Sequence, residues 1–316
     1  MVRAATRSDA RDVRERTAEL LREIRHIEVQ TSRLVEQHLA GSYQSVFKGQ
    51  GIVFSEVRPY EPGDDVRAID WRVTARTGQP HVKLFSEERE LTLLLVVDMS
   101  RSLDLGSVAD DKRHLVARLA ATFAFSAIRN NDRVGLIGFT DRVEVFVPPR
   151  KGRKHVLSVV SQVLSHEPEG TGTDPAVALE YLARLRKGSS VVVLISDFIA
   201  STPPAEDPRF ERALKLVARR HDLIPIRVED PLDLALPELG LVAVEDLEAS
   251  EASAPRWFDL RGRRRKRYAV AVGEERRRFD RLMRRLSLPG VDIRAGDDWQ
   301  KALVGFFARR ARRVAR

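Results

Sequence analysis

The fold is decided by the apolar run LTLLLVV (residues 91–97), which is followed directly by DMSRS (98–102). A continuous apolar run of this length between polar residues is typical of a strand that is covered on both faces. A second run of the same kind, VVVLIS (191–196), precedes Asp197. Strands buried on both faces occur in parallel sheets, whose crossover helices pack on either side. The two runs therefore predict the α/β class.

The segments around these runs alternate between strand and helix patterns. Further strands are predicted at 133–139, 142–147, 223–228 and 291–294, and helices at 111–130, 153–165, 175–186, 208–220, 274–287 and 298–314. This alternation predicts a doubly wound, mostly parallel sheet of the Rossmann-like kind. Only Thr140 and Asp141 separate the first two of these strands, which indicates a tight hairpin. Residues 241–260 indicate a short β insertion in the domain that spans residues 90–316.

Two smaller parts precede this domain. Apolar residues at helical spacing predict one helix over residues 8–40, capped by Ser8 and ended by Gly41, so residues 1–41 form an N-terminal helical part. Residues 42–89 are predicted to form a small β-rich subdomain. Its short strands are expected around Val53, Val57, Ile69, Trp71, Val73 and Val82.

Charge is distributed unevenly along the chain. The 316 residues carry 55 Lys and Arg against 46 Asp and Glu, a net charge of +9. Residues 256–316 hold 20 of these bases and 7 of these acids, a net charge of +13, so the first 255 residues carry −4. The absence of cysteine excludes disulfides, thiolate metal sites and cysteine nucleophiles. No apolar run approaches the roughly 18 residues of a membrane span, and we expect a cytoplasmic protein.

Polar side chains follow both buried strands, at the sheet edge where open α/β folds bind ligands. Asp98, Ser100 and Ser102 follow the first strand, Asp197 follows the second, and Thr173 opens a predicted helix. Two carboxylates and three hydroxyls form an all-oxygen set, which suits Mg²⁺, or alternatively Mn²⁺ or Ca²⁺, better than Zn²⁺. The alternative is that the hydroxyls cap helix N-termini and hold no ion.

The pattern D-x-S-x-S at 98–102, with Thr173 in T-x-x-x-x-A-L and Asp197 at a strand end, resembles the metal-ion-dependent adhesion site of von Willebrand factor A domains. The resemblance implies that the two serines and the threonine contact the metal, whereas Asp98 and Asp197 hold it largely through water. It also implies that a carboxylate from a partner protein fills the open coordination position. Phe198 stands where many such domains have glycine.

A longer signature precedes this site. It reads G-x-G-x-x-F over 49–54, R-x-Y-x-x-G-D-D-x-R-x-I-D-W over 58–71, and A-R at 75–76. The signature resembles the bacterial family labelled domain of unknown function 58, over roughly residues 40–310. That resemblance implies an A-type domain after the signature. It also implies a MoxR-type AAA+ ATPase as partner, which the protein would serve as an adaptor or co-chaperone.

Two groups of charged residues have alternative interpretations. The first is a dense mixed set in the signature: Arg58, Asp64, Asp65, Arg67, Asp70 and Arg76. We expect these charges to satisfy one another in a buried ion-pair and turn network that braces the small subdomain against the domain that follows, with a docking surface as the alternative. The second is the basic C-terminal region, where Glu274–Arg278 and Asp280–Arg284 have the i,i+4 spacing of surface pairs. A solvated face or an acidic protein partner is favoured there over nucleic acid, because no aromatic platform interleaves with the arginines.

Catalytic motifs are lacking in the sequence. It contains no phosphate-binding G-x-x-x-x-G-K-[S/T] loop and no H-E-x-x-H pair, and Ser100 has no evident base within its motif. We therefore expect a non-enzymatic, metal-dependent protein-interaction module with no small-molecule substrate. The alternatives are a nucleic-acid-associated protein that binds through its basic C-terminal segment and, less favoured, a metal-assisted hydrolase.

Overall fold

The computed structural model describes residues 7–36, 53–86, 90–104, 111–185, 188–200, 202–236, 238, 240–244, 256–259 and 262–314. The chain folds into two compact units. Met1–Val46 and Thr92–Arg316 form the larger unit, and Phe47–Leu91 form the smaller one.

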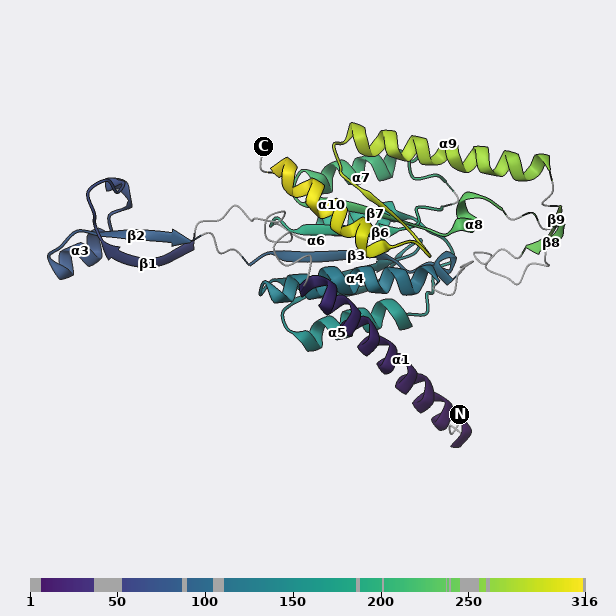
Figure 1. Ribbon diagram of the computed structural model, residues 1–316, viewed down its shortest axis with the longest axis horizontal. Helices are drawn as coiled ribbons and strands as arrows, with labels where there is room; N and C mark the ends of the chain where they lie inside the picture. Colours follow the sequence, from purple (N-terminus) through teal and green to yellow (C-terminus); the bar gives the residue numbers. More distant parts are fainter. Residues whose placement is uncertain are drawn as a thin grey trace. The chain divides into compact units, whose positions relative to one another are not determined.

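A six-stranded sheet forms the centre of the larger unit (Figure 1). Its strands are β3 (Thr92–Asp98), β4 (Arg133–Phe139), β5 (Val143–Arg150), β6 (Val191–Ser196), β7 (Asp222–Glu229) and β10 (Val291–Arg294). They lie in the order β10-β7-β6-β3-β4-β5, and every neighbouring pair is parallel except the β4–β5 hairpin. The predicted mostly parallel α/β sheet, its hairpin and its two fully buried strands, β3 and β6, are confirmed.

Helices cover both faces of this sheet (Figure 1). They are α4 (Lys112–Arg129), α5 (Arg153–Ser165), α6 (Pro175–Leu185), α7 (Pro208–Ala218), α9 (Arg263–Arg285) and α10 (Trp299–Val314). Leu94 and Val96 point to one face of the sheet and pack in a buried cluster with side chains of α6, α7 and α9. Alternate residues of a strand point to opposite faces, so Leu93 and Leu95 face the other layer. In that layer, Phe123 of α4 contacts Phe307 of α10, with ring centroids 5.6 Å apart.

The N-terminal helix α1 (Arg7–Leu34) packs against α4 and α5. Ile24 and Ile27 are buried in this contact, and Glu28 accepts a hydrogen bond from Arg153 Nη2 of α5 over 2.9 Å. The prediction of Ser8 as the N-cap is wrong, because Ser8 lies inside the helix. The predicted stop at Gly41 lies outside the described residues.

The smaller unit contains an antiparallel hairpin of β1 (Val53–Pro59) and β2 (His81–Ser86), a turn η2 (Val66–Ala68) and a helix α3 (Trp71–Thr77). The prediction of strands at Trp71 and Val73 is wrong. Asp70 caps this segment as a helix by accepting hydrogen bonds from two backbone N–H groups, and Gly78 ends it with a left-handed φ of 75°. Apolar residues two apart predicted a strand here, but Asp70 and Gly78 cap the segment as a helix.

The mixed charges of the smaller unit form the predicted network only in part, because Arg67 and Arg76 are exposed and make no ion pair with a described residue. Arg58 binds Asp64 at 2.6 Å, and this hydrogen bond lowers the pKa of the Asp64 carboxyl. Asp65 accepts from the backbone N–H of Arg67, and Asp70 caps α3. These three carboxylates therefore stabilise the local fold.

The C-terminal region begins with the short turn α8 (Pro231–Leu234), followed by the antiparallel pair β8 (Leu241–Val244) and β9 (Arg256–Asp259), which lies within the predicted β segment 241–260. Helix α9 begins 11 residues before its predicted start at 274. The predicted pairs within this helix do not form, because Arg278 pairs with Glu206 and Asp280 pairs with Arg227. Of the helices in the described residues, none combines the length and apolar character that crossing a membrane requires.

Candidate functional site

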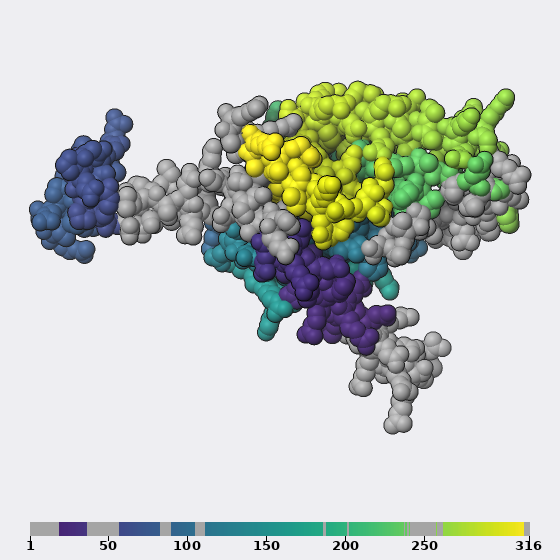
Figure 2. Space-filling model, viewed as in Figure 1, coloured from purple at the N-terminus to yellow at the C-terminus, as the bar shows by residue number. Residues whose placement is uncertain are grey.

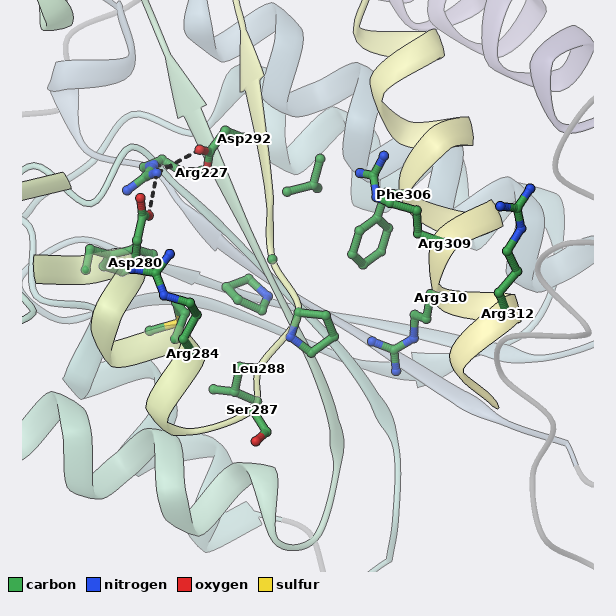
Figure 3. Close-up of a pocket in the computed structure, with 16 residues that line it drawn as sticks. Arg227, Asp280, Arg284, Ser287, Leu288, Asp292, Phe306, Arg309, Arg310 and Arg312 are labelled. Atoms are coloured by element: carbon green, nitrogen blue, oxygen red, sulfur yellow. Dashed lines mark hydrogen bonds and ion pairs between the residues drawn. The ribbon is translucent and has the colours of Figure 1, made fainter. Parts of the chain in front are cut away.

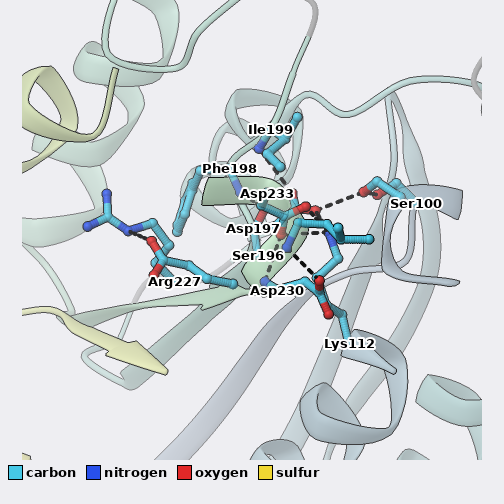
Figure 4. Close-up of polar contacts among 12 residues, drawn as sticks. Ser100, Lys112, Ser196, Asp197, Phe198, Ile199, Arg227, Asp230 and Asp233 are labelled. Carbon is cyan, nitrogen blue, oxygen red and sulfur yellow. Dashed lines mark hydrogen bonds and ion pairs between the residues drawn. The ribbon is translucent and has the colours of Figure 1, made fainter. Parts of the chain in front are cut away.

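The carboxyl ends of β3 and β6 lie side by side and carry the candidate site (Figure 4). Strand β3 ends at Asp98, and the turn η3 (Arg101–Asp104) follows it. Strand β6 ends at Ser196 and is followed by Asp197. Because neighbouring parallel strands end at the same sheet edge, the side chains of both loops meet there.

A chain of hydroxyl and carboxylate oxygens joins the two loops. Ser100 Oγ lies 2.9 Å from Ser102 Oγ, which donates to Asp197 Oδ2 over 3.0 Å. The backbone N–H of Ser100 donates to Asp98 Oδ1 over 2.9 Å. The structure therefore brings four of the five predicted metal ligands into one hydrogen-bonded group.

Asp98 is buried at the base of this group, with 1% of its surface exposed. Burial and the neighbouring Asp197 carboxylate raise the pKa of Asp98 to about 7. Its Oδ2 accepts from Ser196 Oγ over 2.6 Å, which opposes this rise. Among the described residues, no Lys, Arg or His makes an ion pair with Asp98. The carboxylate form of Asp98 is therefore a buried negative charge that the described protein groups compensate only by hydrogen bonds.

The fifth predicted ligand, Thr173, lies in the loop before α6 and is 7% exposed. The next backbone N–H, of Asp174, donates to Thr140 O over 2.9 Å, which attaches this loop to the end of β4. Strand β4 is the neighbour of β3 on the side opposite β6. The structure thus places Thr173 at the same sheet edge, on a different loop from the other four residues.

Glu144 of β5 holds the start of that loop. It accepts from Gly170 N over 2.7 Å, from Glu169 N over 3.2 Å and from Thr140 Oγ1 over 2.6 Å. Burial alone would raise the pKa of Glu144, but these hydrogen bonds outweigh burial and lower it to about 2. A Cβ on Gly170 would lie 2.0 Å from Thr140 Oγ1, so only glycine allows this close approach.

Lys112 is a member of the site that the sequence analysis missed. Its side chain is 1% exposed, and its Nζ donates to Asp197 Oδ2 over 2.8 Å and to Asp233 Oδ2 over 3.1 Å. Burial lowers the pKa of an ammonium, but the two carboxylates outweigh burial, and the pKa of Lys112 is raised. Its position in the sequence could have indicated burial, because Lys112 precedes the apolar Leu115 and Val116 by three and four residues and so lies on the same, buried face of α4.

Asp233 is the second residue that the sequence analysis missed. It lies in α8, where it accepts from the backbone N–H of Asp230 over 2.8 Å in a capping box. Burial raises the pKa of Asp233, and Lys112 opposes the rise. The Tyr268 hydroxyl of α9 donates a hydrogen bond to the Asp233 carbonyl over 3.1 Å, which attaches helix α9 to the backbone of α8.

Phe198 fixes the backbone after Asp197. Its φ of 57° lies in the left-handed region, which glycine adopts freely and phenylalanine rarely does. The Phe198 ring packs on Phe279 at 4.5 Å between centroids and on Phe210 at 6.2 Å. Its backbone N–H donates to Ser196 Oγ, and the next N–H, of Ile199, donates to Asp197 Oδ1. Ring packing and these hydrogen bonds hold a strained turn beside the carboxylate.

The family model of "Protein of unknown function DUF58" matches residues 56–278. The chain belongs to this family. It is 34% identical over 291 residues to the uncharacterized protein Mb1516 of Mycobacterium bovis, covering 92% of this chain and 89% of that protein. It is 24% identical to the uncharacterized protein YeaD of Bacillus subtilis, over 57% of this chain and 49% of that protein. The crystal structure of the conserved hypothetical protein BatB from Bacteroides thetaiotaomicron overlaps with 70% of the chain and 99% of BatB, at a TM-score of 0.42 and 14% identity.

The donor atoms of this DUF58 protein fit a small hard cation. Ser100 Oγ, Ser102 Oγ and Asp197 Oδ2 are joined at 2.9 and 3.0 Å, which are ordinary hydrogen-bond lengths, and all three are hard oxygen donors of the kind that Mg²⁺ prefers. In the part of the chain that the structure describes, no three Asp, Glu, His or Cys side chains gather as a metal site. A cation here would therefore depend on the hydroxyls as well as on the two carboxylates.

Proposed function

We propose that this DUF58 protein is a metal-dependent protein-interaction module with a domain of the von Willebrand factor A type. Its metal ligands are Asp98, Ser100, Ser102, Thr173 and Asp197. The cation is Mg²⁺, with Mn²⁺ or Ca²⁺ as alternatives, and when bound it supplies a Lewis-acidic position for a carboxylate of a partner protein. The observation that carries the proposal is the hydrogen-bonded row of oxygens from Ser100 Oγ to Asp197 Oδ2 beside the buried Asp98 carboxylate, which makes no ion pair with a described residue.

The surrounding residues support this role by holding the oxygens in place. Ser196 fixes one oxygen of Asp98, and Lys112 fixes one oxygen of Asp197. A binding site whose side chains are ordered before the partner arrives loses less conformational entropy on binding. The net charge of Asp98, Asp197 and Asp233 with Lys112 is negative when all four are ionised, which favours a divalent cation.

The proposed role is binding without catalysis. A hydrolase would need a base to activate a hydroxyl or a water molecule. Lys112 is the basic side chain bound to this site, and its two carboxylate partners keep it protonated. A protonated lysine can orient Asp197 but cannot accept a proton, and the carboxylate oxygen to which Ser102 donates, Asp197 Oδ2, is already bound by the Lys112 ammonium.

The proposed partner is a MoxR-type AAA+ ATPase, which this protein would serve in the cytoplasm as an adaptor or co-chaperone. Membership of the DUF58 family and the signature over residues 49–76 support this partner class. A carboxylate on the ATPase, or on a protein that the ATPase remodels, would occupy the metal site.

Calorimetric titration of Mg²⁺ tests the metal site. We expect wild-type protein to bind Mg²⁺ and the double variant Ser100→Ala/Ser102→Ala to lose this binding, because two ligands disappear without a change in charge. The control Ser158→Ala/Ser165→Ala removes two serine hydroxyls from α5 and should bind as wild type does. Equal binding heats for wild type and the first double variant would disprove the metal site. Pull-down of a co-expressed MoxR-type ATPase, with and without EDTA, tests the partner.

A further inference from the structure

The basic C-terminal helices border a groove that the proposed function does not use. It lies between α9, β10 and α10, and its volume is about 720 Å³, which is within the range of sites for small ligands or short peptide segments. Both helices lie on the surface of the larger unit, where α9 is yellow-green and α10 is yellow (Figure 2). The groove is on their sheet-edge side, along the four-residue strand β10.

The groove combines an apolar patch in its wall with arginines at its mouth. Phe279, Met283, Leu288 and Phe306 contribute buried apolar surface to its wall. Exposed arginines border it from both helices, Arg284 from α9 and Arg309 and Arg312 from α10 (Figure 3).

The charges around the groove do not balance. Asp280 and Asp292, the two carboxylates that line it, are both bound by Arg227, at 2.9 and 2.7 Å. Arg310 pairs with Asp222. Within the described residues, no carboxylate lies within ion-pair distance of Arg284, Arg309 or Arg312. Three guanidinium groups thus border a groove of mixed polar and apolar lining, with no described carboxylate to neutralise them.

We propose that this groove binds an acidic segment of a partner protein, in which carboxylates flank an apolar side chain. Guanidinium groups form paired hydrogen bonds with carboxylates, so Arg284, Arg309 and Arg312 would fix the acidic residues at the mouth. The apolar side chain between them would bury against Phe279, Met283 and Leu288. This site is separate from the metal site and does not depend on the proposed function.

The groove fits a peptide better than a nucleic acid. Proteins that bind single strands stack bases on exposed aromatic rings. The two aromatic rings that line this groove, Phe279 and Phe306, are only 7% and 3% exposed. Neither ring therefore presents a free face on which a base could stack. Phosphate binding alone would not need the apolar wall between the arginines.

Fluorescence anisotropy with defined probes tests the proposal. The main probe is a fluorescein-labelled peptide with two leucines flanked on both sides by glutamates. A polyglutamate peptide of the same charge tests the apolar contact, and a labelled single-stranded DNA tests the nucleic-acid alternative. The groove variant is Arg284→Ala/Arg309→Ala/Arg312→Ala. Its matched control is Arg263→Ala/Arg264→Ala/Arg267→Ala, which removes the same charge from exposed positions at the other end of α9.

We expect the groove variant to bind the leucine–glutamate peptide at least tenfold more weakly than wild type, and the control variant to lose less than twofold. Polyglutamate should bind at least tenfold more weakly than the main probe. Equal losses in the two variants, or equal binding of the two peptides, would show non-specific attraction to a basic surface and overturn the proposal. Tighter binding of the DNA, lost in the groove variant, would also overturn it. Thermal unfolding of both variants checks that each remains folded.

Discussion

Replacing Lys112 with methionine separates the roles of its charge and its length. Methionine is apolar and of similar length, so it fills the space of the lysine stem without the ammonium group. The Lys112→Met variant leaves Asp197 and Asp233 without the ammonium that now contacts both, at 2.8 and 3.1 Å. The variant therefore buries two carboxylates beside Asp98, which is itself buried.

The expected cost is large when no metal ion is present. Removing one partner of a buried ion pair costs about 3–5 kcal/mol, because the remaining charge stays buried and uncompensated. In a domain of this size, 1 kcal/mol shifts the melting temperature by roughly 2–4 °C, so we expect the variant to melt roughly 6–20 °C below wild type. A divalent cation bound to Asp197 would replace the lost positive charge. At 100 times its Kd it would return about 2.7 kcal/mol.

Thermal unfolding in EDTA and in Mg²⁺ measures both effects. We expect Mg²⁺ to raise the melting temperature of Lys112→Met more than that of wild type, because the repulsion between the ammonium and the cation is gone. The control is Lys215→Met, which breaks the half-exposed pair with Glu211 on α7 and should cost under about 1 kcal/mol with no response to Mg²⁺. A destabilised Lys112→Met variant that Mg²⁺ fails to stabilise would refute a cation site at Asp197.

Two further predictions concern the loops around the site. Glu144→Gln should lower the free energy of unfolding by about 3 kcal/mol at pH 7, since the pKa of Glu144 falls from 4.5 to about 2 on folding. This stabilisation is present above pH 4.5 and is lost as the pH falls towards 2. Urea unfolding at pH 7, 5 and 3 should therefore show the free energies of unfolding of wild type and Glu144→Gln converging as the pH falls. A difference that stays constant with pH would contradict the lowered pKa of Glu144. At position 198, glycine should be more stable than alanine by about 1 kcal/mol, because φ is 57°. At Phe210, inside α7, the alanine variant should be more stable than the glycine variant, because glycine destabilises a helix interior; chemical denaturation of the four variants measures both differences.

The sheet could be predicted from the sequence because its central strands are buried on both faces and are therefore continuous apolar runs. The strand at 191–196 and the helix at 153–165 match the structure at both ends. Four of the five site residues meet because the carboxyl ends of neighbouring parallel strands must meet. Lys112 and Asp233 could not be assigned in the same way, because their contact joins residues 121 apart in sequence and depends on how α4 and α8 dock.

Helix α9 helps to explain the uneven distribution of charge along the chain. Arg276 pairs with Glu229 at 3.0 Å and Arg285 pairs with Glu211 at 2.7 Å, so the basic C-terminal segment meets carboxylates of the acidic body. The Arg285–Glu211 pair is largely exposed and contributes little to stability. Glu229 is buried, so its pair with Arg276 and the buried side chains of Phe279, Leu282 and Met283 hold the helix on the sheet. Arginines that face the groove are therefore not needed to dock α9, and their substitution should change binding there while leaving the fold intact.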